Sequence, residues 1–147
     1  MFLATAYAGD AEMAQRVERH KEARGAGWAT YEVASGPWGE PEKWVGEAAG
    51  MGDVLLFDCL TLWTSLCLEG GGEVGTLALT DRLLDALAGC GRPVALVSNE
   101  VGMGLVPDNA LGRLFRDVAG LANQKAAAKA DTVVFMVSGL PLYIKGR

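Results

Sequence analysis

The stretch VALVSNEVGMGLVP, residues 94–107, decides the fold class, because it joins an apolar strand to a glycine-rich turn. Its first four residues are apolar without polar alternation, as in strands that are covered on both faces. Gly102 and Gly104 come after the pair Asn99 and Glu100. Glycines at a strand end allow a sharp turn or the close approach of a ligand, although a plain strand-to-helix loop would also use them.

Together with residues 94–97, two other apolar runs have the length of a strand, at residues 54–57 and 132–137. We expect these runs inside a parallel sheet that is covered on both faces. Helical patterns lie between them, at residues 60–68, 80–88 and 111–130, with Thr80 as an N-cap candidate and Gly70–Gly72 as a surface loop. Upstream, residues 1–6 and 28–33 look extended, and helices are expected from Asp10 to about Arg24 and from Pro41 to Ala49. This alternation predicts an α/β fold with a doubly wound, mainly parallel sheet.

The composition indicates one domain, residues 1–147, with 50% apolar and 21% charged residues. No apolar run approaches the roughly 18 residues of a membrane helix, and the N-terminus lacks the basic region of a signal peptide. The formal net charge of -5 gives no general attraction for phosphate backbones, so no nucleic-acid ligand is expected. Three cysteines without C-x-x-C spacing suit a reducing compartment, and we expect a cytoplasmic protein.

Two residues stand where chemistry could occur. His20, the only histidine, lies between Arg16 and Arg24 on a basic helix face, where a lone histidine is most often a solvated surface residue. Asp58 follows an apolar strand, and open α/β sheets bind ligands at their strand ends. A carboxylate there could hold Mg²⁺ or its water, or it could simply cap a helix that begins at Leu60.

A longer pattern connects these positions to a known family. The string from Asn99 to Pro107, with its downstream helix, closely resembles the C-terminal part of the adenosylcobinamide kinase / adenosylcobinamide-phosphate guanylyltransferase family. The resemblance extends over essentially the whole chain. It implies a RecA-like P-loop NTPase fold and an enzyme of cobalamin assembly that uses ATP, GTP and Mg²⁺. The implied substrates are adenosylcobinamide and its phosphate, and a homo-oligomer, a trimer by resemblance, is also implied.

The resemblance also implies roles for single residues. The segment from Arg16 to Arg24 matches the family motif whose histidine becomes covalently guanylylated, which makes His20 the catalytic residue; an imidazole can displace pyrophosphate from the α-phosphorus of GTP. Asp58 corresponds to the Walker B carboxylate that holds Mg²⁺. The implied nucleotide contacts are Ala4, Thr5, Ala6, Lys21, Glu22, Ala23, Arg24, Glu32 and Asp58. Glu32 could otherwise be an exposed strand residue, but a carboxylate can accept hydrogen bonds from both N1–H and the amine of guanine.

One part of the family pattern does not occur in these 147 residues, which contain no Walker A string G-x-x-x-x-G-K-[ST]. Residues 1–6 resemble the family's second strand, so we expect the first strand, the P-loop and the first helix to be absent. Unpaired strand edges are then expected beside Phe2–Ala6 and the neighbouring strands. Either the true start of the protein lies upstream, or the chain is a degenerate remnant.

Three functions follow from these patterns. The two-step enzyme is the leading hypothesis, and a catalytically inactive remnant that binds a corrinoid or partner subunits is its rival. A different P-loop ATPase, such as a RecA-like motor, is disfavoured by the His20 motif and by the string from Asn99 to Pro107. We expect the chain as written to be aggregation-prone or partly molten, and to bind GTP too weakly to measure, because a phosphate cradle supplies much of the binding energy.

Overall fold

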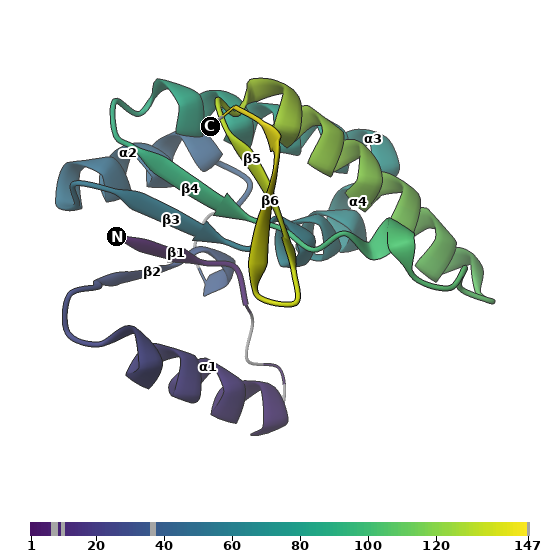
Figure 1. The fold of residues 1–147 in the computed structure, drawn as a ribbon, viewed down its shortest axis with the longest axis horizontal. Coiled ribbons are helices and arrows are strands. Elements are labelled where there is room, and N and C mark those ends of the chain that lie inside the picture. The colour runs from purple at the N-terminus through teal and green to yellow at the C-terminus, as the bar shows by residue number, and fades with distance from the viewer. Residues whose placement is uncertain (7–8, 10, 36–37, 147) are drawn as a thin grey trace.

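The computed structural model describes residues 1–6, 9, 11–35 and 38–146, which form alternating strands and helices (Figure 1). The elements, in chain order, are β1 (Phe2–Ala4), α1 (Ala11–Arg24), β2 (Thr30–Glu32), η1 (Val33–Ser35), α2 (Pro41–Met51), β3 (Leu55–Asp58), α3 (Leu60–Gly89), β4 (Val94–Val97), η2 (Val101–Met103), α4 (Ala110–Lys129), β5 (Val133–Val137) and β6 (Leu140–Lys145). The predicted α/β class is confirmed. The N-cap that we expected at Asp10 lies outside the described residues.

The main sheet has four strands in the order β2-β1-β3-β4, and every neighbouring pair is parallel. Its register puts Ala4 opposite Asp58 on one side and opposite Glu32 on the other. Asp58 in turn pairs with Val97. The carboxyl ends of all four strands therefore meet along one edge of the sheet, where open α/β sheets bind ligands.

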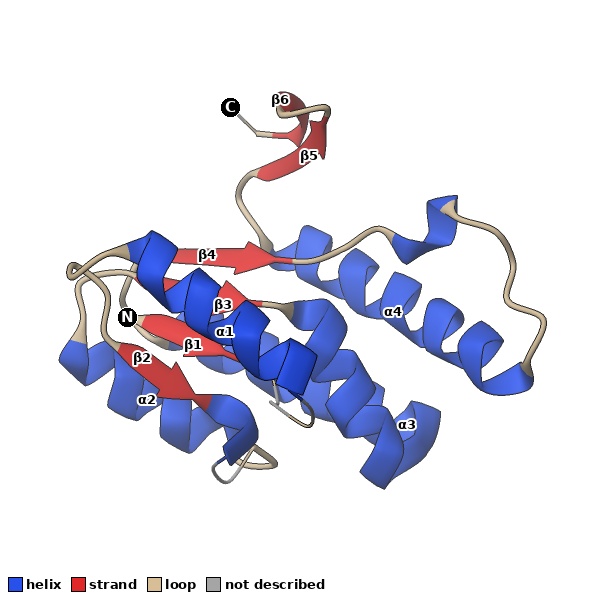
Figure 2. Ribbon diagram, turned by 90° about the horizontal axis from the view of Figure 1, so that it is seen from below, coloured by secondary structure: helices blue, strands red, loops and turns tan. Residues whose placement is uncertain are grey.

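Helices lie on both faces of this sheet, with α1 on one side and α2 and α3 on the other (Figure 2). The core is on the side of α2 and α3, where Trp44, Phe57 and Trp63 are fully buried. Their ring centroids are 6.0 to 6.2 Å apart, in stacked and edge-on arrangements. Burial of each large apolar side chain contributes about 1.5 to 3 kcal/mol, so this aromatic cluster is a main source of stability.

The long element α3 is a helical hairpin. Its backbone leaves the helical region at Gly72, which has φ 58° and ψ -167°. The indole Nε1 of Trp63 donates to Thr80 Oγ1 at 3.3 Å. These residues would be about 25 Å apart in a straight helix, so the chain must reverse at Gly72. The predicted break between two helices is confirmed, but it is tighter than the expected Gly70–Gly72 loop, and Thr80 lies inside the second helix instead of capping it.

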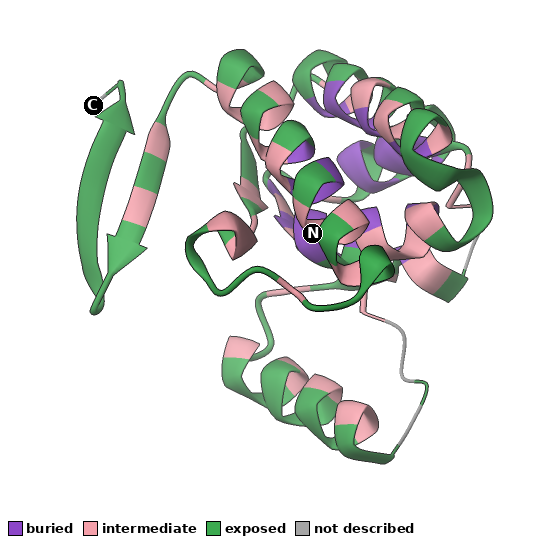
Figure 3. Ribbon diagram, turned by 90° about the vertical axis from the view of Figure 1, so that its right-hand side faces the viewer, coloured by how far each residue is buried: buried purple, intermediate pink, exposed green. Residues whose placement is uncertain are grey.

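The prediction that residues 132–137 lie inside the parallel sheet is wrong. Of the described strands, β5 pairs with β6 alone, in an antiparallel hairpin that stands apart from the sheet (Figure 3). Ser138 and Gly139 have φ 52° and φ 79°, which is the geometry of a tight type I′ hairpin turn. An apolar run predicts a strand but does not specify its partner, and this turn brings the next residues of the chain alongside.

The prediction of an unpaired edge beside Phe2–Ala6 is also wrong, because β1 is paired on both sides. The edge strands are instead β2 and β4: among the strands of the described residues, β2 pairs with β1 alone and β4 pairs with β3 alone. On the face that carries α1, the side chains of Ala95 and Val97 are exposed. The edge at β4 thus lies beside a part of the sheet face that the described part of the chain leaves exposed.

No helix in the described ranges is both long enough and apolar enough to cross a membrane.

Candidate functional site

A cavity of about 820 Å³ lies between α1 and the carboxyl ends of β1, β2 and β3. This volume is in the usual range for sites that bind small molecules. Seven of the residues predicted for the site line the cavity: Ala4, Ala6, His20, Lys21, Arg24, Glu32 and Asp58. Residues that are far apart in the sequence therefore meet at one place.

The floor of the cavity is set by strand register. Glu32, Ala4 and Asp58 form one row across β2, β1 and β3, and residues in a row project from the same face of a sheet. Strands are about 4.8 Å apart, so the two carboxylate residues are about 10 Å apart along the row. Ala4 places only a methyl group between them, which leaves room for a ligand over the middle of the row.

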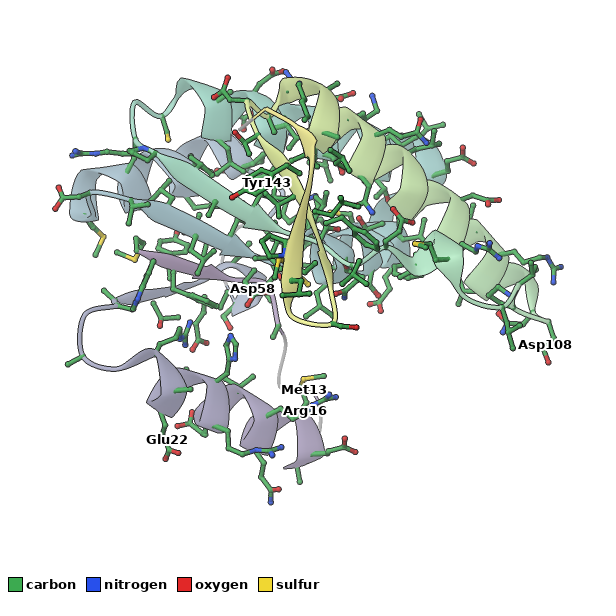
Figure 4. The ribbon with its side chains drawn as sticks, in the orientation of Figure 1. Met13, Arg16, Glu22, Asp58, Asp108 and Tyr143 are labelled. Atoms are coloured by element: carbon green, nitrogen blue, oxygen red, sulfur yellow. The ribbon has the colours of Figure 1, made fainter. Side chains whose placement is uncertain are left out.

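Helix α1 contributes the opposite wall. His20 Nε2 lies 3.2 Å from Asp58 Oδ2, and Figure 4 shows Asp58 at the end of β3 on the side that faces α1. A carboxylate oxygen accepts hydrogen bonds, so Nε2–H of the imidazole is the donor in this contact and Nδ1 is directed away from Asp58. The cap residue of α3 is Cys59, without a side-chain cap bond, so the alternative role of Asp58 as a helix cap is wrong.

Lys21 closes one end of the cavity. Its Nζ donates to Glu32 Oε1 at 3.1 Å and lies 3.4 Å from Glu18 Oε1. The hydrogen bonds to Glu32 and then to Glu18 raise the pKa of the Lys21 ammonium above its ordinary value. Lys21 therefore stays charged throughout the physiological pH range. A ligand that contacts the Glu32 carboxylate would also lie close to the Lys21 ammonium.

Arg24 lies one turn further along α1. Its Cζ is 3.5 Å from the centroid of the Phe2 ring, which is cation–π geometry. Its Nη1 is buried and has no hydrogen-bond partner in the described part of the chain. No sequence pattern distinguishes Phe2, since an apolar residue in a short strand looks like any core residue.

Three predicted residues lie elsewhere. Thr5 is buried, and its Oγ1 accepts from Cys59 N at 2.7 Å and donates to Cys59 O at 3.0 Å, which fixes the β1 and β3 ends together. Glu22 and Ala23 are exposed, and Glu22 points away from the sheet (Figure 4). Their roles in nucleotide binding remain predictions.

The string after β4 forms a polar network of its own. Ser98 Oγ donates to Asn123 Oδ1 at 2.6 Å, and Asn123 Nδ2 donates to Asn99 O at 3.1 Å. Asn99 N donates to Thr61 Oγ1 at 2.8 Å. The network ties the end of β4 to the start of α3 and to α4. A Cβ at Gly102 would approach Glu100 Oε1 to 2.9 Å, a contact that the end of this flexible side chain could relieve by moving.

Asp58 is the residue predicted to hold a metal ion. Among the described residues, no group of three or more histidine, cysteine, aspartate or glutamate side chains is placed to hold a metal ion. A single carboxylate at a strand end nevertheless suits Mg²⁺, which is usually held by one or two carboxylates, substrate phosphates and water. The donor set therefore fits an ion that arrives with a nucleotide and does not fit a permanent all-protein site.

Comparison with known proteins decides the family. The model of the family "Cobinamide kinase / cobinamide phosphate guanyltransferase" matches residues 1–144. The chain belongs to this family. Members of the cobinamide kinase / cobinamide phosphate guanyltransferase family are bifunctional enzymes of cobalamin biosynthesis, so the resemblance that the string from Asn99 to Pro107 suggested is confirmed.

Three curated relatives support the assignment. The chain is 38% identical over 158 residues to the bifunctional adenosylcobalamin biosynthesis protein CobU of Salmonella typhimurium, with 99% of this chain and 85% of the relative covered. The Escherichia coli protein of the same name is 35% identical at the same coverage. CobP of Pseudomonas aeruginosa is 37% identical over 148 residues, with 99% and 82% covered.

Proposed function

We propose that this protein phosphorylates adenosylcobinamide and then transfers GMP from GTP to adenosylcobinamide phosphate, with His20 as the covalent carrier. The observation that supports this most strongly is the contact between His20 and Asp58 at the wall of a nucleotide-sized cavity. Both residues match the family motif, and β3 and α1 bring them together from opposite sides.

In the guanylyl transfer, an imidazole nitrogen of His20 attacks the α-phosphorus of GTP. A nitrogen–phosphorus bond forms, the bond to the bridging oxygen breaks, and pyrophosphate leaves. A phosphate oxygen of adenosylcobinamide phosphate then attacks the same phosphorus. The nitrogen–phosphorus bond breaks, giving adenosylcobinamide-GDP and the free imidazole.

The other cavity residues have complementary tasks in this proposal. Glu32 accepts from N1–H and the amine of guanine, a pair of donors that adenine lacks. Lys21 and Arg24 neutralise phosphate charge from the C-terminal turns of α1. Asp58 orients the imidazole before the nucleotide binds, and it would hold Mg²⁺, which neutralises phosphate charge when bound.

The kinase step transfers the γ-phosphoryl group of ATP or GTP to the aminopropanol hydroxyl of adenosylcobinamide. It needs a phosphate-binding loop, and the 147 residues contain no G-x-x-x-x-G-K-[ST] string. We propose that the open edge of β4 accepts a further parallel strand that leads into such a loop. The exposed Ala95 and Val97 would be covered by the helix that follows the loop.

Labelling with α-³²P-GTP tests the guanylyl step. The protein should acquire an acid-labile, base-stable label that γ-³²P-GTP does not give, because the γ-phosphate leaves in pyrophosphate. His20→Ala and His20→Asn should both abolish the label. Label that persists in either variant would exclude His20 as the carrier.

The absence of a Walker A string from the sequence favours one alternative, a catalytically inactive remnant that binds a corrinoid or partner subunits. Calorimetric titration of the 147-residue chain with GTP and Mg²⁺, and separately with adenosylcobinamide, distinguishes the two. Corrinoid binding with neither GTP binding nor label would establish the alternative. Micromolar GTP binding by a cooperatively folded chain would exclude it, and would show that the missing loop is less important than we expect.

A homo-oligomer is part of the proposal. The β5–β6 hairpin exposes Met136, Leu140 and Ile144, which is more apolar surface than a lone hairpin can support in water. The implied trimer should be evident in sedimentation equilibrium, and a strictly monomeric chain at all concentrations would contradict it.

A further inference from the structure

Phe2 is buried on the side of the sheet that carries α1. It is 4% exposed, and its neighbour Leu3 is fully buried on the opposite face, in the main core. Because successive residues of a strand alternate between faces, Phe2 cannot share that core. Two residues of α1, His20 and Arg24, contact its ring.

One ring contacts two residues of the proposed active site. The Phe2 and His20 rings have centroids 5.8 Å apart in an edge-on arrangement with an interplanar angle of 64°. The guanidinium of Arg24 lies over the face of the same ring, 3.5 Å from its centroid. His20 and Arg24 are four residues apart, on one face of α1, so a single ring fixes that whole face.

This contact matters because α1 is more exposed than the helices on the other face of the sheet. None of its fourteen residues is buried. Two polar contacts that join it to the sheet are His20 with Asp58 and Lys21 with Glu32, and both pairs are partly exposed. Exposed ion pairs contribute little and are screened by salt. The Phe2 ring gives the helix a buried apolar contact with the sheet.

The same contact prepares Arg24 for an anion. A guanidinium that lies flat on an aromatic ring keeps its N–H groups in the ring plane of the guanidinium, free to donate sideways. Its Nη1 is buried without a partner in the described structure, and Arg24 lines the cavity. An oxyanion in the cavity would therefore meet a guanidinium that still has a donor to spare, and a small movement of the side chain would bring Nη1 to it.

We infer that Phe2 is a positioning residue for the proposed reaction, whose ring holds the imidazole of His20 and the guanidinium of Arg24 at the cavity. This inference rests on the proposed function. The ring does not touch the reacting atoms; it determines where α1 presents its nucleophile and its phosphate-binding cation. Any flat aromatic side chain of similar size should serve, and an aliphatic one should not.

The single histidine gives a direct test without catalysis. In the ¹H NMR spectrum of the 147-residue chain, the Cε1–H signal of His20 should shift in Phe2→Leu, because the ring current is lost. Phe2→Tyr should restore it. Phe135→Leu makes the same change in the β5–β6 hairpin and should leave it in place. An unshifted signal in Phe2→Leu, or no recovery in Phe2→Tyr, would overturn the inference.

Two further measurements keep the test decisive. If Phe2→Leu does not fold, a nuclear Overhauser effect between His20 and the Phe2 ring in the unaltered chain is required, and its absence would count against the inference. Where guanylylation is active, Phe2→Leu should lower the rate of adduct formation and raise the GTP concentration for half-saturation, each roughly two- to thirtyfold, the range that a cation–π contact permits. If the unaltered chain forms no adduct, the proposed function fails while the NMR result still decides the role of Phe2.

Discussion

The two faces of the main sheet are covered in different ways. On one face, α2 and α3 bury Leu3, Leu55 and Phe57 completely. On the other face, α1 contributes no buried residue and reaches the sheet through polar side chains and one aromatic ring. The two faces therefore have different roles. The face under α2 and α3, here called the packed face, maintains the fold, and the face under α1, here called the thin face, leaves its polar groups available to a ligand.

Neighbouring leucines of β3 provide the strongest test of this division. Leu55→Ala should lower the free energy of unfolding by about 2 to 5 kcal/mol, because Leu55 is fully buried in the core. Leu56 points to the other face and is only half-buried, so Leu56→Ala should cost clearly less. Urea denaturation measures both, and equal losses would show that the second face is packed as well as the first.

The thin face should respond in activity instead. Asp58→Asn should lower both turnover rates by roughly 10²- to 10³-fold, as expected when one charged group of a preorganised site is lost, while thermal unfolding changes little. Asp53→Asn is the matched control, since its side chain is 105% exposed. A loss of thermal stability with turnover retained would return Asp58 to a structural role.

Cysteine labelling probes the packed face without any substitution. Burial raises the pKa of the Cys67 thiol to about 12, so at pH 8 it carries almost no reactive thiolate in the folded protein. Iodoacetamide should label the half-buried Cys90 first, and Cys67 only after denaturation. Because the unfolded chain ionises this thiol first, stability should also fall as the pH rises above about 9 towards 12. Rapid native labelling of Cys67 would mean that the core opens.

The smallest effect is expected at the rim of the thin face. Lys21→Ala removes an exposed ion pair with Glu32, so the unfolding midpoint should stay within experimental error. The GTP concentration for half-saturation should rise a few-fold, because Lys21 lies beside the proposed guanine and phosphate contacts. Lys43→Ala, on the exposed side of α2, should change neither quantity. A large loss of stability in Lys21→Ala would show that α1 is held mainly by charge.

The sequence predicted the strands and helices of the packed face because their apolar periodicity reflects burial. It failed for β5, where the same apolar pattern belongs to a hairpin whose partner is chosen by the Ser138–Gly139 turn. It also placed the open edge beside β1, although hydrogen bonds to both neighbours satisfy that strand. Which strands pair depends on segments that are far apart in the sequence, and the apolar pattern of a single strand does not reveal its partners.

For the site, the family motif led to His20, Glu32 and Asp58, which the structure brings to one cavity. A motif gives positions along the chain but does not say where each side chain points. It therefore grouped Glu22 with its neighbours, although the Glu22 side chain points away from the sheet. Helical periodicity would have separated Glu22 from His20 and Arg24, which are one turn apart. Phe2 had no such signal, because its importance arises from what packs on it.

The row that joins Glu32, Ala4 and Asp58 has a consequence for how the protein tolerates insertions and deletions. Its geometry is set by backbone pairing between β2, β1 and β3, and side chains alternate with period two. Deleting one residue within β3 would turn Asp58 towards the core and bring an apolar residue to the cavity. The number of residues in β3 is thus under tighter constraint than the identity of its apolar side chains. A substitution of one apolar residue by another leaves Asp58 facing the cavity, whereas an insertion or deletion does not.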